Sequence, residues 1–473
     1  MVTPRLALLT TLVLSLPILA TAKDAKPFLL EAQKALGDVT TLQYSGTGMS
    51  GSFGQALLAG KEWPRRELSA FTRSINYEQR ASRDELTFVQ AVIGGTQQTT
   101  QVSGDKAWSV GASGPTPQLA AAEERQLHIW LTPHGFLKAA SSAPDANLER
   151  KAGADVVSFT ALGKYKVDGT FDAQHRLTQV ATRIASPVLG DTDLIARYSD
   201  YRAFDAIQFP ARIEMDQGGF PLWELSITHV TPNASVDLAI PEAVASATLA
   251  PVQTVSTKLA EGVWHISGGS HHSVLVEFKD FVAMIEAPQD ERRSLALLAE
   301  TSKLVPSKPV RYVLTTHHHF DHSGGLRTFV AQGATVVTHQ SNVDYFRKSL
   351  VAPATIRPDA QSKNPKRPKL QGVADKYVLT DGKQTIEIFA TNGDAHTGEY
   401  TLIYLPGPKI LVEADAFSPA PVGVPPPATP PPNAIALYDE LKRLKLDVAM
   451  IAPIHGRGAV PMDEMLKVIG KTS

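Results

Sequence analysis

Histidines and aspartates gather in one short segment, Thr316-His317-His318-His319-Phe320-Asp321-His322-Ser323-Gly324-Gly325. His317 and His319 are two residues apart, so in extended backbone their imidazoles leave on the same side and can bind one cation. His318, between them, is expected to point the other way. Asp321 and His322 lie past the bend and can reach a second cation a few ångströms away. The spacing therefore predicts a centre for two metal ions.

Three further groups complete two coordination spheres. His396, Asp415 and His455 each stand at or just after the end of a strand-like stretch. The stretches that precede them are 385–390, 410–414 and 448–451. Ligands of α/β sheets collect outside the carboxyl ends of strands, so these side chains are expected to meet the first group there. The Asp415 carboxylate has two oxygens and can bridge two metals.

The chain has no cysteine, so any metal site must use nitrogen and oxygen donors alone. Zinc is the default ion for a histidine-rich site, and iron or manganese suit the same ligands. Two divalent ions that share a water lower its pKa from about 15.7 towards neutrality, which supplies hydroxide at physiological pH. Asp321 would orient that hydroxide and carry its proton to the leaving group. This chemistry predicts a metal-dependent hydrolase.

Predicted strands alternate with predicted helices around these ligands, and this alternation indicates an α/β architecture for residues 252–473. The predicted strands there include 264–266, 273–277, 281–285, 310–314 and 335–338, with helices at 291–301 and 326–332. A proline-rich run at 418–432 and the segment 341–371 are expected to border the cleft, and the N-terminal domain is a further candidate for its border. Their roles, and those of His271 and His272 ahead of the strand at 273, stay open. Both histidines could line the cleft, although loop or packing roles are favoured.

Residues 23–245 predict a mainly antiparallel β (α+β) domain. A helix is expected at 27–36, and a second one at 123–140 is interrupted near Pro133. Two hairpins join 166–171 to 177–184 and 211–215 to 223–230. The long meander with an N-terminal helix resembles, in pattern only, the half-barrel of periplasmic lipoprotein carriers. The boundary between the domains falls in the Ala/Pro-rich run 241–251.

The first 22 residues read as a signal peptide. Arg5 precedes an apolar stretch from Leu6 to Ala20, and Ala20-Thr21-Ala22 has the small-x-small pattern that a signal peptidase requires. We therefore expect a periplasmic or secreted protein with no integral membrane segment after cleavage. A formal charge of −1 gives no electrostatic case for nucleic acid. The expected partner is a small-molecule substrate, and the oligomeric state stays open.

The ordered set of histidines and aspartates resembles the metallo-β-lactamase superfamily, whose motif is His-x-His-x-Asp-His followed by a later His, Asp and His. The resemblance implies an αββα sandwich from about residue 255 to the C-terminus. It implies that the first metal is held by three histidines, His317, His319 and His396. It implies that the second metal is held by Asp321, His322 and His455, with Asp415 bridging the two.

Two positions depart from parts of that superfamily. Its β-lactamases have cysteine or serine where this chain has Asp415, whereas a bridging aspartate is typical of the glyoxalase II, lactonase and phosphodiesterase branches. Glu286 stands where many members have an aspartate, which leaves the support of the ligands open. Export and a near-zero charge disfavour RNase Z-like nucleases, and the seven-ligand set disfavours the mono-iron sulfur dioxygenases.

The sequence thus favours an exported hydrolase of an ester, thioester, lactone, amide or phosphodiester. One alternative is a metallo-β-lactamase that opens β-lactam rings. Another is a periplasmic binding or carrier protein with a non-catalytic metal domain. A bound metal together with turnover of generic esters would favour the first hypothesis, and retention of a hydrophobic ligand without turnover would favour the last.

Overall fold

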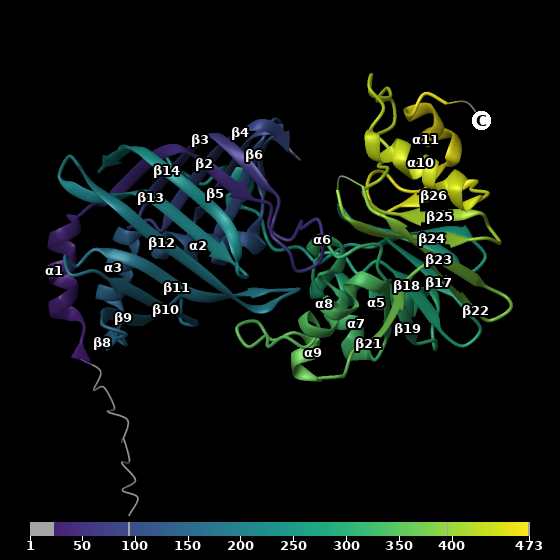
Figure 1. The fold of residues 1–473 in the computed structure, drawn as a ribbon, viewed down its shortest axis with the longest axis horizontal. Helices are drawn as coiled ribbons and strands as arrows, with labels where there is room; N and C mark the ends of the chain where they lie inside the picture. Colours follow the sequence, from purple (N-terminus) through teal and green to yellow (C-terminus); the bar gives the residue numbers. More distant parts are fainter. Residues whose placement is uncertain (1–22, 93–94, 395, 472–473) are drawn as a thin grey trace, which may run out of the picture.

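The structure is a computed structural model that describes residues 23–92, 95–394 and 396–471. The predicted signal peptide, residues 1–22, lies outside the described residues. Two β-rich parts lie next to one another, one built on a single large sheet and one on two smaller sheets (Figure 1). No helix among the described residues is both long enough and apolar enough to span a membrane.

The first part is an antiparallel sheet of fourteen strands in the order β1-β8-β9-β10-β11-β12-β13-β14-β2-β3-β4-β5-β6-β7, counted over the described residues. Its strands are β1 (Lys23–Asp24), β2 (Thr41–Gly51), β3 (Arg65–Asn76), β4 (Ala81–Val92), β5 (Gly95–Ser103), β6 (Lys106–Gly111), β7 (Gly114–Pro117), β8 (Asn147–Lys151), β9 (Ala154–Ala161), β10 (Tyr165–Phe171), β11 (Leu177–Ser186), β12 (Gly190–Phe204), β13 (Ile207–Gln217) and β14 (Phe220–Pro232). The pairing of β14 with β2 joins the two halves of the meander. Both predicted hairpins, β10–β11 and β13–β14, are confirmed.

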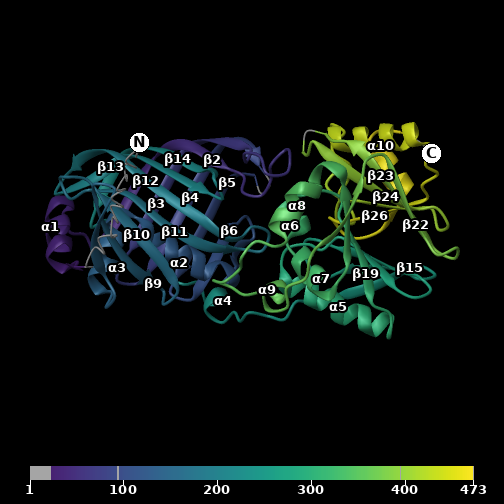
Figure 2. The same ribbon diagram turned by 60° about the horizontal axis from the view of Figure 1, so that its bottom comes forward.

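Helices cover one face of this sheet (Figures 1 and 2). They are α1 (Lys26–Leu36), the 3₁₀ turn η1 (Leu119–Ala121), α2 (Ala122–Leu131), α3 (Pro133–Ser142) and, near the boundary, α4 (Glu242–Ala245). Thr132 lies in extended backbone between α2 and α3, and its side chain caps α3 by accepting from the Gly135 amide. The predicted interruption near Pro133 is therefore confirmed. Leu127 and Phe136 of these helices share one core with Phe209 of the sheet.

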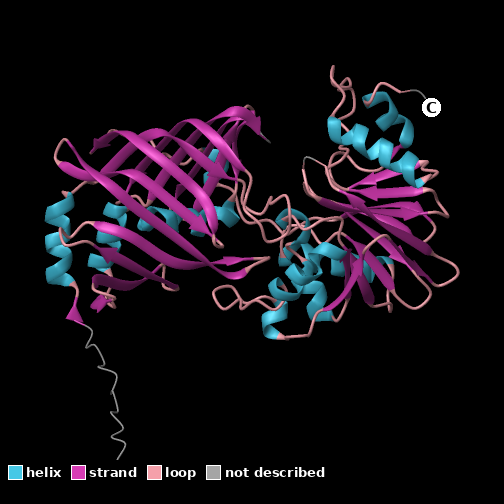
Figure 3. Cartoon of the chain, viewed as in Figure 1, coloured by secondary structure: helices cyan, strands magenta, loops and turns pink. Residues whose placement is uncertain are grey.

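The second part is a four-layer αββα sandwich (Figure 3). One sheet holds β15 (Val255–Ala260), β16 (Val263–Ser267), β17 (Ser273–Glu277), β18 (Val282–Ile285), β19 (Val310–Leu314), β20 (Thr335–His339) and β21 (Lys369–Val373). The other holds β22 (Lys376–Thr380), β23 (Thr385–Asn392), β24 (Glu399–Leu405), β25 (Ile410–Glu413), β26 (Met450–Pro453) and β27 (Val460–Pro461). Their inner faces share a core in which Val274 and Leu314 pack with Ile403 and Val412.

The outer faces are covered by helices. The helices are α5 (Glu291–Leu304), α6 (Phe320–Ser323), α7 (Leu326–Gln332), α8 (Val343–Ser349), α9 (Ala360–Lys363), α10 (Pro432–Leu444) and α11 (Met462–Val468), with the 3₁₀ turn η2 (Gln340–Asn342). Leu297 of α5 and Phe329 of α7 belong to the core over the first sheet. Leu437 of α10 and Met465 of α11 belong to the core over the second. The predicted α/β sandwich is thus what the sequence forms.

Parallel pairing brings the ligand-bearing segments to one edge. β18, β19 and β20 run parallel, as do β25 and β26. Glu286 follows β18, the histidine segment follows β19, and Asp415 and His455 follow β25 and β26. Because parallel strands share a carboxyl end, residues as far apart in sequence as Glu286 and His455 are presented at the same edge.

The segment between β2 and β3, residues 52–64, reaches from the large sheet to this edge. Phe53 and Trp63 pack edge-on against Phe320 at ring-centroid distances of 5.2 and 5.5 Å. A second contact joins β12 to the chain after α8, where the Asp191 carboxylate accepts from the Thr355 and Ile356 amides. The two parts are therefore tied together directly beside the predicted metal centre.

Candidate metal centre

The structure brings all seven predicted ligands to one place. Donor atoms of His317, His319 and His396 lie within 4.8 Å of one another. Three buried nitrogens of this group, His317 Nε2, His319 Nδ1 and His396 Nε2, have no hydrogen-bond partner among the described residues. Unpartnered buried nitrogens are costly unless something binds them. Three of them from one cluster fit a divalent cation.

Asp321, His322 and His455 form the neighbouring group. His322 Nε2 lies 3.8 Å from Asp321 Oδ2 and 3.2 Å from His455 Nε2. Asp415 stands between the two groups. Its Oδ2 is 2.8 Å from His322 Nε2 and 3.4 Å from His317 Nε2, while Oδ1 is 3.0 Å from His455 Nε2. This placement suits a bridging carboxylate.

Local backbone geometry presents these groups. Asp415 has a φ of +64°, in the left-handed region, within a tight turn in which the Ala416 amide donates to the Ala414 carbonyl. Asp is among the few residue types that adopt this conformation readily. The Asp394 carboxylate accepts from the His396 amide at 2.7 Å and shapes the turn that carries His396.

Hydrogen bonds determine which ring nitrogen of each histidine is free. His322 Nδ1 lies 2.8 Å from Glu286 Oε2, and His455 Nδ1 lies 3.2 Å from the Ser270 carbonyl. His319 uses its other nitrogen, Nε2, to donate to the Ala56 carbonyl at 2.9 Å. The remaining nitrogens then face the cluster, as in metal sites whose ligands are oriented by outer partners.

Glu286, which stands where many members of the superfamily have an aspartate, supports the ligand candidates from behind. It is fully buried, and Oε1 accepts from the Thr316 amide at 2.6 Å while Oε2 faces His322. The carboxylate therefore supports both the histidine segment and one of the ligand candidates.

Burial and neighbouring charges set the protonation of the cluster. Burial lowers the pKa of His317 well below its ordinary value and that of His319 to about 3, so both rings are neutral donors at neutral pH. Burial alone would raise the pKa of Asp415, but His322 and His455 hold it well below its usual range. Burial lowers the pKa of His322, yet Asp415 and Glu286 outweigh it and raise that pKa well above normal.

His318 belongs to neither group. Its Nε2 donates to the Ala56 carbonyl at 2.9 Å, and its Nδ1 lies 2.9 Å from the buried Glu399 carboxylate. It therefore helps to fix the segment between its two ligand neighbours. His272 is likewise a packing residue, because its ring contacts the Gly456 carbonyl and His265.

The sequence left the contribution of the large-sheet domain open, and its residues at the centre were not predicted. Gln55 Nε2 donates to Asp321 Oδ1 at 2.8 Å, and Ala56 supplies the carbonyl shared by His318 and His319. Gly54, at φ +78°, lies so close to Phe320 that a Cβ would stand 2.6 Å from its ring. Only glycine fits there, so this residue permits the close approach of residues 52–64 to Phe320.

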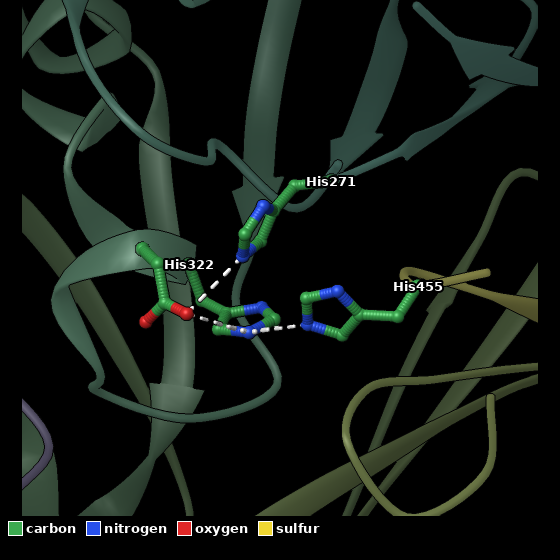
Figure 4. A group of neighbouring side chains, drawn as sticks. His271, His322 and His455 are labelled. Carbon is green, nitrogen blue, oxygen red and sulfur yellow. Dashed lines mark hydrogen bonds and ion pairs between the residues drawn. The ribbon is translucent and has the colours of Figure 1, made fainter. Parts of the chain in front are cut away.

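His271 was also left without a firm role, and the structure places it in the centre. Its Nε2 lies 3.1 Å from Asp321 Oδ2, and its ring faces His455 at a centroid distance of 4.3 Å. Figure 4 shows the imidazoles of His271, His322 and His455 converging from three segments of the chain.

Two cavities open beside the cluster. One of about 350 Å³ is lined by His319, Asp321 and His396 on one side and by Gln55 and Arg66 of the large-sheet domain on the other. The second, of about 590 Å³, is lined by Asp415 and much of the proline-rich run 418–432. The proline-rich run and the N-terminal domain therefore do border the centre.

Comparison with known proteins agrees with this geometry. Residues 266–455 match the family model described as the metallo-beta-lactamase superfamily, which identifies the C-terminal domain, and not the whole chain, with that superfamily. None of the curated proteins matches the chain.

Solved structures with similarity to the chain include a metallo-beta-lactamase from Pontibacter korlensis, at 20% identity, 46% coverage of this chain, 98% of that chain and a TM-score of 0.35. They also include the metallo-beta-lactamase FIM-1 from Pseudomonas aeruginosa in its mono-zinc form, at 18% identity, 46% and 94% coverage and a TM-score of 0.35.

Proposed function

We propose that this protein is a metal-dependent hydrolase whose centre binds two divalent ions, with zinc favoured. The observation that carries the proposal is the set of buried nitrogens on His317, His319 and His396 that have no partner among the described residues. They lie beside a second group built around Asp321, His322 and His455. Superfamily membership supports hydrolysis as the class of reaction.

The ligand roles follow the two groups. His317, His319 and His396 would hold the first ion, and Asp321, His322 and His455 would hold the second, with Asp415 bridging. When bound, such a pair of ions activates water as a nucleophile and polarises the carbonyl or phosphoryl oxygen of the substrate.

The residues themselves orient the reactants. Asp321 Oδ1 accepts from Gln55 Nε2 at 2.8 Å, which fixes the carboxylate, and its Oδ2 lies 3.1 Å from His271 Nε2. A carboxylate fixed in this way can orient the nucleophilic water and pass its proton to the leaving group. The cavity of about 350 Å³ next to Asp321 has the size of a small-molecule site.

The substrate class we propose is an ester, thioester, lactone, amide or phosphodiester. Asp415, in place of cysteine or serine, supports these classes over β-lactams. We further propose that the enzyme acts in the periplasm or outside the cell, a proposal that rests on the signal-like sequence of residues 1–22.

The test uses the full mature chain, stripped of metal and then reloaded with zinc. Both forms are offered representative esters, thioesters, lactones, amides, phosphodiesters and a β-lactam. We expect turnover of at least one of the first five by the zinc form, and loss of that turnover in the stripped form and in Asp321→Asn. Turnover of the β-lactam alone would assign the enzyme to the lactamases. Retention of a hydrophobic ligand without hydrolysis of any compound would support a carrier protein and refute the proposal.

A further inference from the structure

The loop between β16 and β17 lies against the segment that carries His455. The His272 amide donates to the Ile454 carbonyl at 2.8 Å, and His455 Nδ1 lies 3.2 Å from the Ser270 carbonyl. One contact joins backbone atoms and the other uses the His455 ring, and together they hold the two loops against each other. They place His271 next to His455, although 184 residues separate the two in sequence.

A buried arginine holds this loop in shape. Arg293 of α5 is 1% exposed, and its guanidinium donates to the carbonyls of Gln253, Ile266 and Ser267 at 3.0, 3.1 and 3.2 Å. A longer contact of 3.4 Å reaches the His271 carbonyl. The backbone of His271 is thereby fixed before any ion binds, which limits the freedom of its side chain.

The imidazole of His271 is oriented as a ligand would be. Nδ1 lies 2.8 Å from Ser270 Oγ, which also accepts from Gln289 Nε2 at 3.1 Å. When Nδ1 donates to that hydroxyl, Nε2 carries a free lone pair and points at the cluster (Figure 4). This is the arrangement in which a second partner fixes the tautomer of a metal-binding histidine.

The spacing of the donor atoms fits one tetrahedral ion. Zinc–nitrogen and zinc–oxygen bonds of about 2.0–2.2 Å place the ligand atoms of a tetrahedron roughly 3.3–3.6 Å apart. The separations here are 3.1 Å from His271 Nε2 to Asp321 Oδ2, 3.8 Å from Asp321 Oδ2 to His322 Nε2, and 3.2 Å between His322 Nε2 and His455 Nε2. All four donors lie within 4.8 Å of one another.

We propose that His271 is a fourth protein ligand of the second metal ion, together with Asp321, His322 and His455. The inference rests on the proposed function, because it requires that the centre binds metal. Counting the shared Asp415, five side chains would then hold the second ion, and four, His317, His319, His396 and Asp415, would hold the first. The first ion would therefore be the less crowded of the two and the one with room for a substrate oxygen.

The rival account is that His271 only donates a hydrogen bond to Asp321. His271→Gln separates the two, because the amide of glutamine can still donate to Asp321 but its nitrogen is no metal ligand. His271→Phe removes both interactions and keeps the ring volume. His339→Gln is the matched control, since His339 also contacts a serine hydroxyl through Nδ1 and belongs to neither group.

The measurement is a chelator titration of the zinc-loaded full chain with metal content as the readout, repeated through the visible absorption of the Co²⁺-loaded protein. We expect His271→Gln and His271→Phe to release the second ion at about 10- to 100-fold lower chelator concentration than wild type, with the Co²⁺ spectrum changed. In both His271 variants the first ion should be released at the wild-type chelator concentration. In His339→Gln both ions should be released as in wild type.

Wild-type affinity for both ions in His271→Gln would overturn the coordination by His271 and leave the proposed function standing. If wild type itself bound fewer than two ions, both proposals would fail. Should His271→Phe not fold, His271→Gln alone decides the matter.

Discussion

The side-chain amide of Gln55, in the large-sheet domain, donates a 2.8 Å hydrogen bond to Asp321 Oδ1, in the metal domain, across 266 residues of sequence. Asp321 is the carboxylate to which we assign both metal binding and proton transfer. The neighbouring Ala56 carbonyl accepts from His319 at 2.9 Å. The N-terminal domain therefore helps to orient the proposed metal ligands.

Gln55→Ala should lower kcat and the affinity for the second ion by about 10- to 100-fold, the usual effect of removing an outer partner of a ligand. Steady-state kinetics and metal content measured on the same preparation check this. Gln43→Ala removes a comparable amide, bonded to Ser74 at 2.9 Å on the same sheet, and should leave both quantities unchanged. Equal losses in the two variants would show that Gln55 acts only through domain stability.

The sequence predicted those parts of the centre that local spacing encodes. His317, His319, Asp321 and His322 stand in one segment, and the strand that precedes them could be recognised from its apolar residues. The contributions of Gln55 and Ala56 could not be predicted, because they depend on the packing of residues 52–64 against the other domain. That of His271 depends on the packing of the loop between β16 and β17 against the segment that carries His455.

The architecture shows the same division. Hairpins with short turns, such as β10–β11, follow from turn residues and alternating side chains. The pairing of β14 with β2, which makes one sheet of the meander, joins residues such as Val230 and Tyr44. Such pairing is set by tertiary packing, not by any local pattern.

Glu286→Gln should weaken the second ion by about 10- to 100-fold and leave the fold intact, because the charge that faces His322 Nδ1 is removed while the volume is kept. Isothermal titration with zinc on metal-stripped protein checks this. The control is Glu300→Gln on α5, whose carboxylate accepts from Ser256 at 2.8 Å away from the centre. Unaltered zinc affinity in Glu286→Gln would remove the supporting role assigned to Glu286.

Acidification should release the second ion before the first. Asp415 and Glu286 raise the pKa of His322 well above its ordinary value of about 6.5 despite burial, so an ion must displace a proton there even at neutral pH. Affinity at this site therefore falls as soon as the pH falls. Burial lowers the pKa of His317, and that of His319 to about 3, so protons compete for these two ligands of the first ion only at much lower pH.

Dialysis of the zinc-loaded protein at stepwise lower pH, with metal content measured at each step, tests this order. We expect a plateau near one ion per chain before the last is lost. Simultaneous loss of both ions would contradict the assigned protonation states. So would retention of the last ion by Asp321, His322 and His455.

Asp191 should contribute measurably to the docking of the two domains. Its carboxylate accepts from the Thr355 amide at 2.9 Å, the Thr355 hydroxyl at 2.6 Å and the Ile356 amide at 3.1 Å. Burial raises its pKa, but these hydrogen bonds outweigh burial and lower it below the usual value. The stabilisation is thus present above the unfolded pKa of about 3.9 and disappears as the pH falls through the folded pKa.

Asp191→Asn should cost about 1.5–3 kcal/mol at pH 7, the range for hydrogen bonds to a charged group. Asp193→Asn, two residues along β12 with a side chain 67% exposed, should change stability by no more than about 0.5 kcal/mol. Urea unfolding of both variants at pH 7 measures the difference. Equal stabilities would mean that the Asp191 contact contributes nothing to domain docking.

Anomalous X-ray diffraction from crystals of the zinc-loaded protein would show directly whether one chain binds two metal ions at this edge of the sandwich. We expect two anomalous peaks about 3.5–4 Å apart. One should lie among His317, His319 and His396, the other among His271, Asp321, His322 and His455, with Asp415 touching both. A single peak, or peaks away from these side chains, would contradict the two-metal account.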